Sequence, residues 1–129
     1  MQKETEIWLV YSEENLEAAK VLLENKLYNP CLHNIQQSIE KALKSLFIEK
    51  VISFKKTHSI MELKTILEKN SILVGLTEDE CEFLDSVYLP TKYPVGSALP
   101  YFNPDKSICH NSISLAERII KEVKSLISK

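Results

Sequence analysis

The chain has 129 residues, of which 44% are hydrophobic and 26% are charged, and this length and balance are typical of one folded domain. A domain of this size buries about two-thirds of its unfolded surface, so it needs neither a metal nor a disulfide for stability. The 16 basic and 18 acidic residues give a formal net charge of −2, which excludes a protein that coats nucleic acid by charge alone. Only two glycines and five prolines interrupt the chain. The composition therefore predicts a single all-α domain over residues 1–129.

The cysteines indicate free thiols in a cytoplasmic protein. Cys31, Cys81 and Cys109 are an odd set without CxxC spacing. Cys31 and His33 together with Cys109 and His110 offer metal-ligand types, but their spacing is not that of a closed zinc site, so we expect no metal. No cofactor is expected either. The apolar runs are far shorter than the roughly 20 residues of a membrane span, and the N-terminal segment does not resemble a signal peptide.

Apolar residues at three- and four-residue steps predict two long helices in the first part of the chain. The first is predicted from Thr5 to Lys26. The second is predicted from Pro30 to Val51, with Asn29 as its N-cap, because proline is favoured at the first helical position. A short turn between them indicates that the two helices pair antiparallel.

Two capping boxes predict the next two helices. Ser59 with Glu62 precedes a short apolar-periodic segment, and Thr77 with Glu80 precedes a helix expected over about Glu78 to Tyr88. In this motif the side chain of the first residue accepts a hydrogen bond from the backbone of the fourth, which stabilises the start of the helix.

The segment from Leu89 to Tyr101 contains three prolines and a glycine, and it is predicted to be an irregular loop. Asn103 and Pro104 repeat the asparagine–proline start, and apolar periodicity carries a last helix to the C-terminus. Packed back along the first two, this helix completes an up-and-down antiparallel bundle of four to five helices.

Three segments resemble the HEPN (higher eukaryotes and prokaryotes nucleotide-binding) family. They are the run QQSIEKALK from Gln36 to Lys44, the run KTHS from Lys56 to Ser59, and Tyr88 followed by Lys92-Tyr93-Pro94. The resemblance extends over essentially the whole chain in the expected order. It implies a HEPN-like helical bundle that forms homodimers, and a bacterial or archaeal two-gene system of the toxin–antitoxin kind with a small nucleotidyltransferase partner.

The candidate ligand-binding residues supply cationic nitrogen for phosphate and aromatic faces for a base, and they are Lys44, Lys56, His58, Lys92 and Tyr93. The polar signature of the second helix comprises Gln36, Gln37, Glu40 and Lys41. Because Gln36 and Glu40 are one turn apart, they are predicted to form a network with Lys44. A structural reading stays open, in which Lys44 and Lys56 are solvated, Tyr93 packs the loop, and His58 fixes the start of the third helix.

Ribonuclease members of this superfamily carry arginine followed by histidine after four to six residues, and this chain departs from that pattern. Its one arginine, Arg118, has no histidine after it, and the nearest approximation is Lys106 with His110. The leading hypothesis is therefore a non-catalytic module that binds a nucleotide, RNA or a nucleotidyltransferase partner. The alternatives are a divergent ribonuclease toxin, in which Lys106 with His110 or His58 with Lys92 replaces the motif, and a purely structural helical dimerisation domain.

Overall fold

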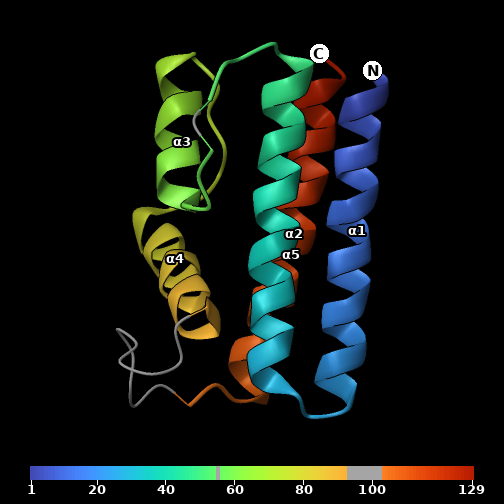
Figure 1. Ribbon diagram of the computed structural model, residues 1–129, viewed down its shortest axis with the longest axis vertical. Coiled ribbons are helices and arrows are strands. Elements are labelled where there is room, and N and C mark those ends of the chain that lie inside the picture. The colour runs from blue at the N-terminus through green and yellow to red at the C-terminus, as the bar shows by residue number, and fades with distance from the viewer. Residues whose placement is uncertain (55, 93–102) are drawn as a thin grey trace.

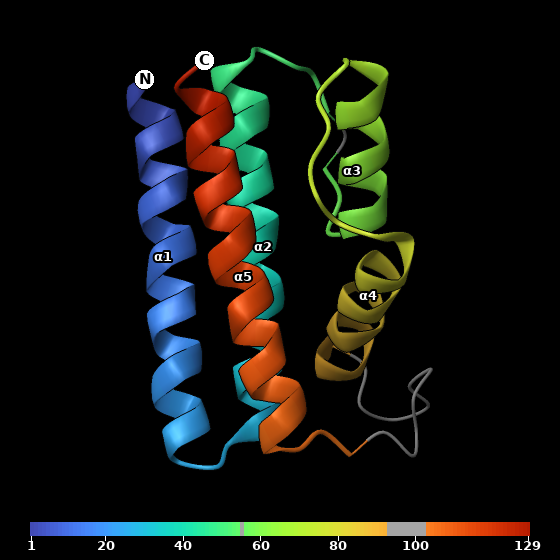
Figure 2. The same ribbon diagram turned by 180° about the vertical axis from the view of Figure 1, so that it is seen from behind.

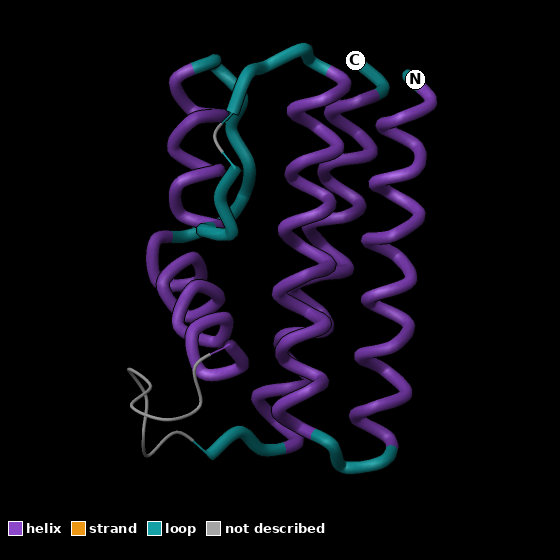
Figure 3. Tube along the Cα trace, in the orientation of Figure 1, coloured by secondary structure: helices purple, strands orange, loops and turns teal. Residues whose placement is uncertain are grey.

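The computed structural model describes residues 1–54, 56–92 and 103–129, and within them every regular element is a helix (Figure 3). The helices are α1 (Lys3–Glu24), α2 (Tyr28–Glu49), α3 (Ile60–Lys69), α4 (Glu78–Lys92) and α5 (Lys106–Ile127). The three long helices lie side by side, with α1 antiparallel to α2 and α5, while α3 and α4 lie one above the other beside them (Figures 1 and 2). The predicted all-α bundle is confirmed.

Helix α2 is the centre of the packing, since α1, α3, α4 and α5 all contact it. Its apolar side chains Ile35, Ile39, Leu43 and Phe47 are fully buried. Polar side chains of the same helix are buried as well, and Ser38 forms reciprocal hydrogen bonds with Ser12 on α1 through their hydroxyl groups and backbone carbonyls. Helix α2 is therefore held on all sides, which fixes the polar residues that it carries.

Both predictions of an asparagine–proline helix start are wrong. Helix α2 begins at Tyr28 with Leu27 as its N-cap, so Asn29 and Pro30 lie inside its first turn. A proline there removes no intrahelical bond, because the first backbone N–H groups have no acceptor within the helix. Helix α5 begins at Lys106, and its N-cap is Asp105, whose carboxylate accepts a hydrogen bond from the backbone of Ile108 at 2.8 Å.

The predicted loop from Leu89 to Tyr101 begins too early. Helix α4 continues through Pro90 to Lys92 instead of ending at Tyr88. Proline removes one backbone donor and bends a helix, but it does not prevent one more turn. The remainder of the predicted loop, residues 93–102, lies outside the described residues.

Three helices end in a left-handed residue that is not glycine. The predicted ends of α1 and α2, Lys26 and Val51, each lie two residues beyond the last helical residue, because these two residues have φ values of 61° and 54°. The start of α1 differs as well, since the helix begins two residues before the predicted Thr5. Ser71 occupies the same place after α3, with φ of 62°. In each case the next residue donates its backbone N–H back across the turn at 2.9 Å: Leu27 to Leu22, Ile52 to Phe47, and Ile72 to Leu67. These are Schellman ends.

One of the two predicted capping boxes is complete, and the other is half formed. Thr77 and Glu80 form the complete reciprocal pair at 3.0 and 2.9 Å. Ser59 Oγ accepts from the backbone of Glu62 at 3.1 Å, while the backbone N–H of Ser59 donates to Thr57 Oγ1 instead of to Glu62. The start of α3 is therefore fixed directly after His58.

Asp85 on α4 joins this helix to the start of α3, and Arg118 on α5 joins it to a long helix. Asp85 on α4 accepts from Ser59 Oγ at 2.8 Å and from the backbone of Ile60 at 2.6 Å, so its carboxylate lies against the positive end of α3. Arg118 on α5 donates to the carbonyl of Gly75 and to Glu80. These contacts position α4 beside the segment that carries His58.

Candidate functional site

A column of polar side chains runs along the face of α2 directed toward α3 and α4. Gln36, Glu40 and Lys44 are spaced four residues apart, and Glu40 and Lys44 are only 3% and 7% exposed. Buried polar groups require partners, and these residues supply them to each other. Glu40 accepts from Gln36 Nε2 at 3.3 Å and from Lys44 Nζ at 2.9 Å. The contacts of Gln36 and Lys44 with Glu40 agree with the network predicted from the spacing.

His58 joins this column from the segment before α3. Its Nδ1 lies 3.2 and 3.3 Å from the two carboxylate oxygens of Glu40, and its backbone carbonyl accepts from Gln36 Nε2 at 3.1 Å. A carboxylate only accepts hydrogen bonds, so Nδ1 carries the hydrogen. In the neutral imidazole the second nitrogen, Nε2, is then the free acceptor. We call Gln36, Gln37, Glu40, Lys44 and His58 the Glu40 network.

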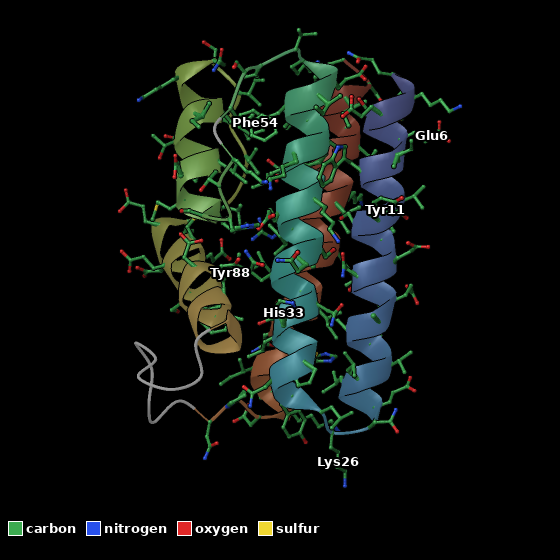
Figure 4. The ribbon with its side chains drawn as sticks, viewed as in Figure 1. Glu6, Tyr11, Lys26, His33, Phe54 and Tyr88 are labelled. Atoms are coloured by element: carbon green, nitrogen blue, oxygen red, sulfur yellow. The ribbon has the colours of Figure 1, made fainter. Side chains whose placement is uncertain are left out.

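The imidazole of His58 is held on its flat side by Tyr88 of α4. The two ring centroids are 4.9 Å apart and the planes are inclined by 18°, which is a stacked arrangement. Figure 4 shows Tyr88 on the side of α4 that faces α2. The side chain of His58 is nevertheless 45% exposed. Its ring is therefore fixed by Glu40 and Tyr88 while part of it remains accessible to a ligand.

Lys44 is buried rather than solvated. Besides its ion pair with Glu40, its ammonium group lies 5.9 Å from the ring centroid of Trp8 on α1, within the range of a cation–π contact. The charge of Lys44 is thus balanced inside the protein. Its position makes it a partner of Glu40 first, and a direct phosphate contact would require that pair to open.

Of the other predicted site residues, one joins the Glu40 network and the rest lie elsewhere or outside the described part. Gln37 Nε2 donates to Gln36 Oε1 at 2.7 Å and so extends the Glu40 network, whereas Lys41 Nζ donates to Asn15 at 2.7 Å on the α1 side of α2. Lys56 is exposed on the bend two residues before His58. Lys92 is the last residue of α4 but its side chain is outside the described part, and so is the whole of Tyr93.

Two residues of α4 contribute to this site although they were not among the predicted site residues. Tyr88 stacks on His58, and Asp85 holds the residues that follow His58 in place. They are three residues apart and so lie on one face of α4. Tyr88 belongs to the segment that resembles the HEPN family, and this was its one sequence signal. No sequence signal pointed to Asp85, because its hydrogen-bond partners are 24 to 26 residues away in the chain.

The three cysteines are buried in the core, and Arg118 joins α5 to neighbouring segments. All three thiols are buried, and burial raises the pKa of Cys31 to about 12 and that of Cys81 to about 11. Within the described ranges, no three histidine, cysteine or acidic residues gather closely enough to hold a metal ion. Arg118 is engaged by Glu80 and the Gly75 carbonyl. Lys106 and His110 lie exposed on the first turns of α5 and line one cavity.

None of the helices in the described part combines the length and apolarity required to cross a membrane.

The fold is an all-helical bundle of five helices in the described residues, and comparison with known proteins identifies its family. Residues 5–126 match the HEPN domain family, and the chain belongs to that family. It is 27% identical over 142 residues to a Methanocaldococcus jannaschii protein named "Putative toxin MJ1304", covering 98% of this chain and 90% of the relative.

Two crystal structures are similar over nearly their whole length. The archaeal HEPN homologue ST0689 has a TM-score of 0.71 and 28% identity, with 98% of this chain and 99% of that chain covered. The protein TT1696 from Thermus thermophilus has a TM-score of 0.75 and 26% identity, with 96% and 98% covered. The chain is similar to both in fold as well as in sequence.

Proposed function

We propose that this HEPN protein binds a nucleotide, or the phosphodiester of RNA, at the face where His58 and Tyr88 meet, and that it does so as the toxin-like component of a two-gene system. The observation that carries the proposal is that Glu40 and Tyr88 orient the imidazole of His58 while part of the ring stays exposed to solvent. A side chain that is oriented by a buried carboxylate and a stacked ring loses little freedom when a ligand binds.

The chemistry of the site suits a phosphorylated ligand. When protonated, His58 can donate from Nε2 to a phosphate oxygen in a charge-assisted hydrogen bond, with Glu40 stabilising its positive charge. Lys56 is exposed two residues before it, and Lys92 follows Tyr88 by one turn of α4. These two lysines are the cations that we assign to phosphate. Lys44 supports the site through Glu40, and Tyr93 remains a proposed aromatic contact.

The relative that is named as a toxin supports the two-gene setting. We extend the proposal to a homodimer and to a small nucleotidyltransferase partner in the cytoplasm. The exposed apolar side chains Ile7, Val10 and Tyr11 on the outer face of α1 are where we expect the second copy to pack. Replacing Tyr11 by lysine should shift the mass in solution from dimer to monomer, as measured by light scattering.

A second candidate function is RNA cleavage, and the contact between Glu40 and His58 favours it. A carboxylate that fixes the Nδ1–H of a histidine leaves Nε2 ready to accept a proton, which is the arrangement of a general base. The proton donor would be a ribose 2′-hydroxyl that attacks the adjacent phosphate. Within the described residues, no second histidine lies in the Glu40 network, so the departing 5′-oxygen would take back the proton that His58 Nε2 received from the 2′-hydroxyl.

Calorimetric titration with ATP, GTP and a short single-stranded RNA tests the proposal, with the RNA examined for cleavage afterwards. We expect saturable nucleotide binding, intact RNA and loss of binding in His58→Ala. Lys56→Ala should weaken binding, while the control Lys69→Ala, an exposed lysine at the end of α3, should leave it unchanged. Cleavage of the RNA by the unmodified protein, together with no cleavage by His58→Ala, would establish the second candidate. Absence of binding to all three ligands would refute the ligand proposal and leave the protein partner.

A further inference from the structure

One buried carboxylate, that of Glu40, is shared by two basic side chains. Lys44 Nζ lies 2.9 Å from Glu40 Oε2, and His58 Nδ1 lies 3.2 Å from the same oxygen. Glu40 and Lys44 are buried, so solvent screens the charges around this oxygen less than it would on the surface. The charge states of the three side chains therefore depend on one another.

The charges balance while His58 is neutral. The ammonium group of Lys44 and the carboxylate of Glu40 then cancel, and His58 adds a hydrogen bond from Nδ1 without adding charge. A proton on Nε2 of His58 would place a second positive charge beside the same carboxylate. A nearby like charge disfavours the charged form of a group. Lys44 therefore opposes a protonation of His58 that Glu40 alone would favour.

The other charged groups around His58 are engaged elsewhere or lie in solvent. On α4, the carboxylate of Asp85 is bound to the start of α3, and Tyr88 stacks its ring on the imidazole. On the segment of His58 itself, Glu62 accepts a hydrogen bond from a threonine hydroxyl at 3.1 Å, and Lys56 is exposed. Among the described residues, the ion pairs near His58 are thus those of the Glu40 network.

We propose that Lys44 is a positioning residue that acts through Glu40: it keeps His58 unprotonated in the free protein, so that the imidazole takes up a proton together with a phosphorylated ligand. This inference rests on the function proposed above. The negative charge of the ligand balances the added proton, which comes from the solvent, and Nε2 then donates to the phosphate. Ligand binding and proton uptake are thereby linked, and affinity should fall as the pH rises.

Nitrogen-15 NMR of His58 during a pH titration without ligand tests the role of Lys44. Lys44→Gln keeps a hydrogen-bond donor for Glu40 but removes the charge, so the pH at which half of His58 is protonated should rise by about one unit. The matched control is Lys41→Gln, which removes a lysine of the same helix that is bound to Asn15. Equal values for Lys44→Gln and the unmodified protein overturn the proposal, as does an equal rise in Lys41→Gln.

Urea unfolding of the same variant gives a second test. Lys44→Gln leaves Glu40 without its buried counter-charge, and a proton on His58 should replace that charge. The folded variant then binds this proton more readily than the unfolded chain, so its loss of stability should be smaller at about pH 5.5 than at about pH 8. Adding His58→Gln should reduce this difference. A variant that is unfolded or equally destabilised at both pH values overturns the proposal, and so does a difference that His58→Gln leaves unchanged.

Calorimetry with ATP near pH 7, in buffers that differ in their enthalpy of ionisation, tests the link to the ligand. The unmodified protein should take up more protons on binding ATP than Lys44→Gln, in which His58 is already protonated. Equal uptake by the two proteins overturns the link. Absence of ATP binding refutes the proposed function and the link with it, while the NMR titration without ligand still decides the role of Lys44.

Discussion

Replacement of Glu40 by glutamine should destabilise the protein strongly, because Glu40 balances a buried charge. Glu40 is 3% exposed and accepts from Lys44, which is 7% exposed and 2.9 Å away. Glutamine keeps the size of the side chain but removes its charge, so Lys44 is left buried without a counter-charge. Breaking a buried ion pair on one side typically costs about 3–5 kcal/mol. That is a large part of the roughly 5–15 kcal/mol by which domains of this kind are stable.

Urea unfolding followed by circular dichroism measures this effect. The double variant Glu40→Leu with Lys44→Met should recover much of the lost stability, since replacing both members of a buried pair by apolar residues removes the unpaired charge. The control is Glu68→Gln, which breaks an ion pair with Lys64 of similar length, 2.9 Å, at a more exposed place and should cost less than about 1 kcal/mol. Equal small losses for Glu40→Gln and Glu68→Gln would show that Lys44 does not need Glu40 as its counter-charge.

Three further predictions concern helix ends, thiols and pH. Val51→Gly should raise the unfolding midpoint, because glycine adopts the left-handed φ of 54° without strain, and an unchanged or lower midpoint in thermal unfolding would oppose this. Cys31, Cys81 and Cys109 should react with Ellman's reagent at pH 8 only after denaturation, since burial raises the pKa of each thiol; rapid reaction of the native protein would contradict their burial. Burial lowers the pKa of His33 below its usual 6.5, so the unfolded state binds more protons than the folded state. The free energy of unfolding should therefore fall as the pH drops below about 6.5. In urea unfolding, His33→Asn should show a smaller fall.

The sequence predicted those features that depend on residues close together in the chain. Four-residue spacing placed Gln36, Glu40 and Lys44 on one face of α2, and their hydrogen bonds agree with this placement. The Thr77 and Ser59 caps were predictable because each motif lies within four residues. These interactions follow from the geometry of a single helix.

Features that depend on packing between elements could not be read from the sequence. The stacking of Tyr88 on His58 and the contact of Asp85 with the start of α3 join segments that the chain separates by more than 20 residues. The end of α2 was misplaced because Val51 disfavours a left-handed conformation, and the Schellman bonds around it override that preference. The rule for proline misled at Pro30, because the rule marks a frequent position and not a required one.

Nitrogen-15 NMR of the histidine side chains during an ATP titration tests whether His58 contacts the ligand. The chain has three histidines, so His33, His58 and His110 report separately on the side of α2, the Glu40 network and the first turns of α5. We expect the ring nitrogen signals of His58 to shift until saturation while those of His33 stay unchanged, whatever His110 does. Saturation of the protein by ATP with unmoved His58 signals would contradict it.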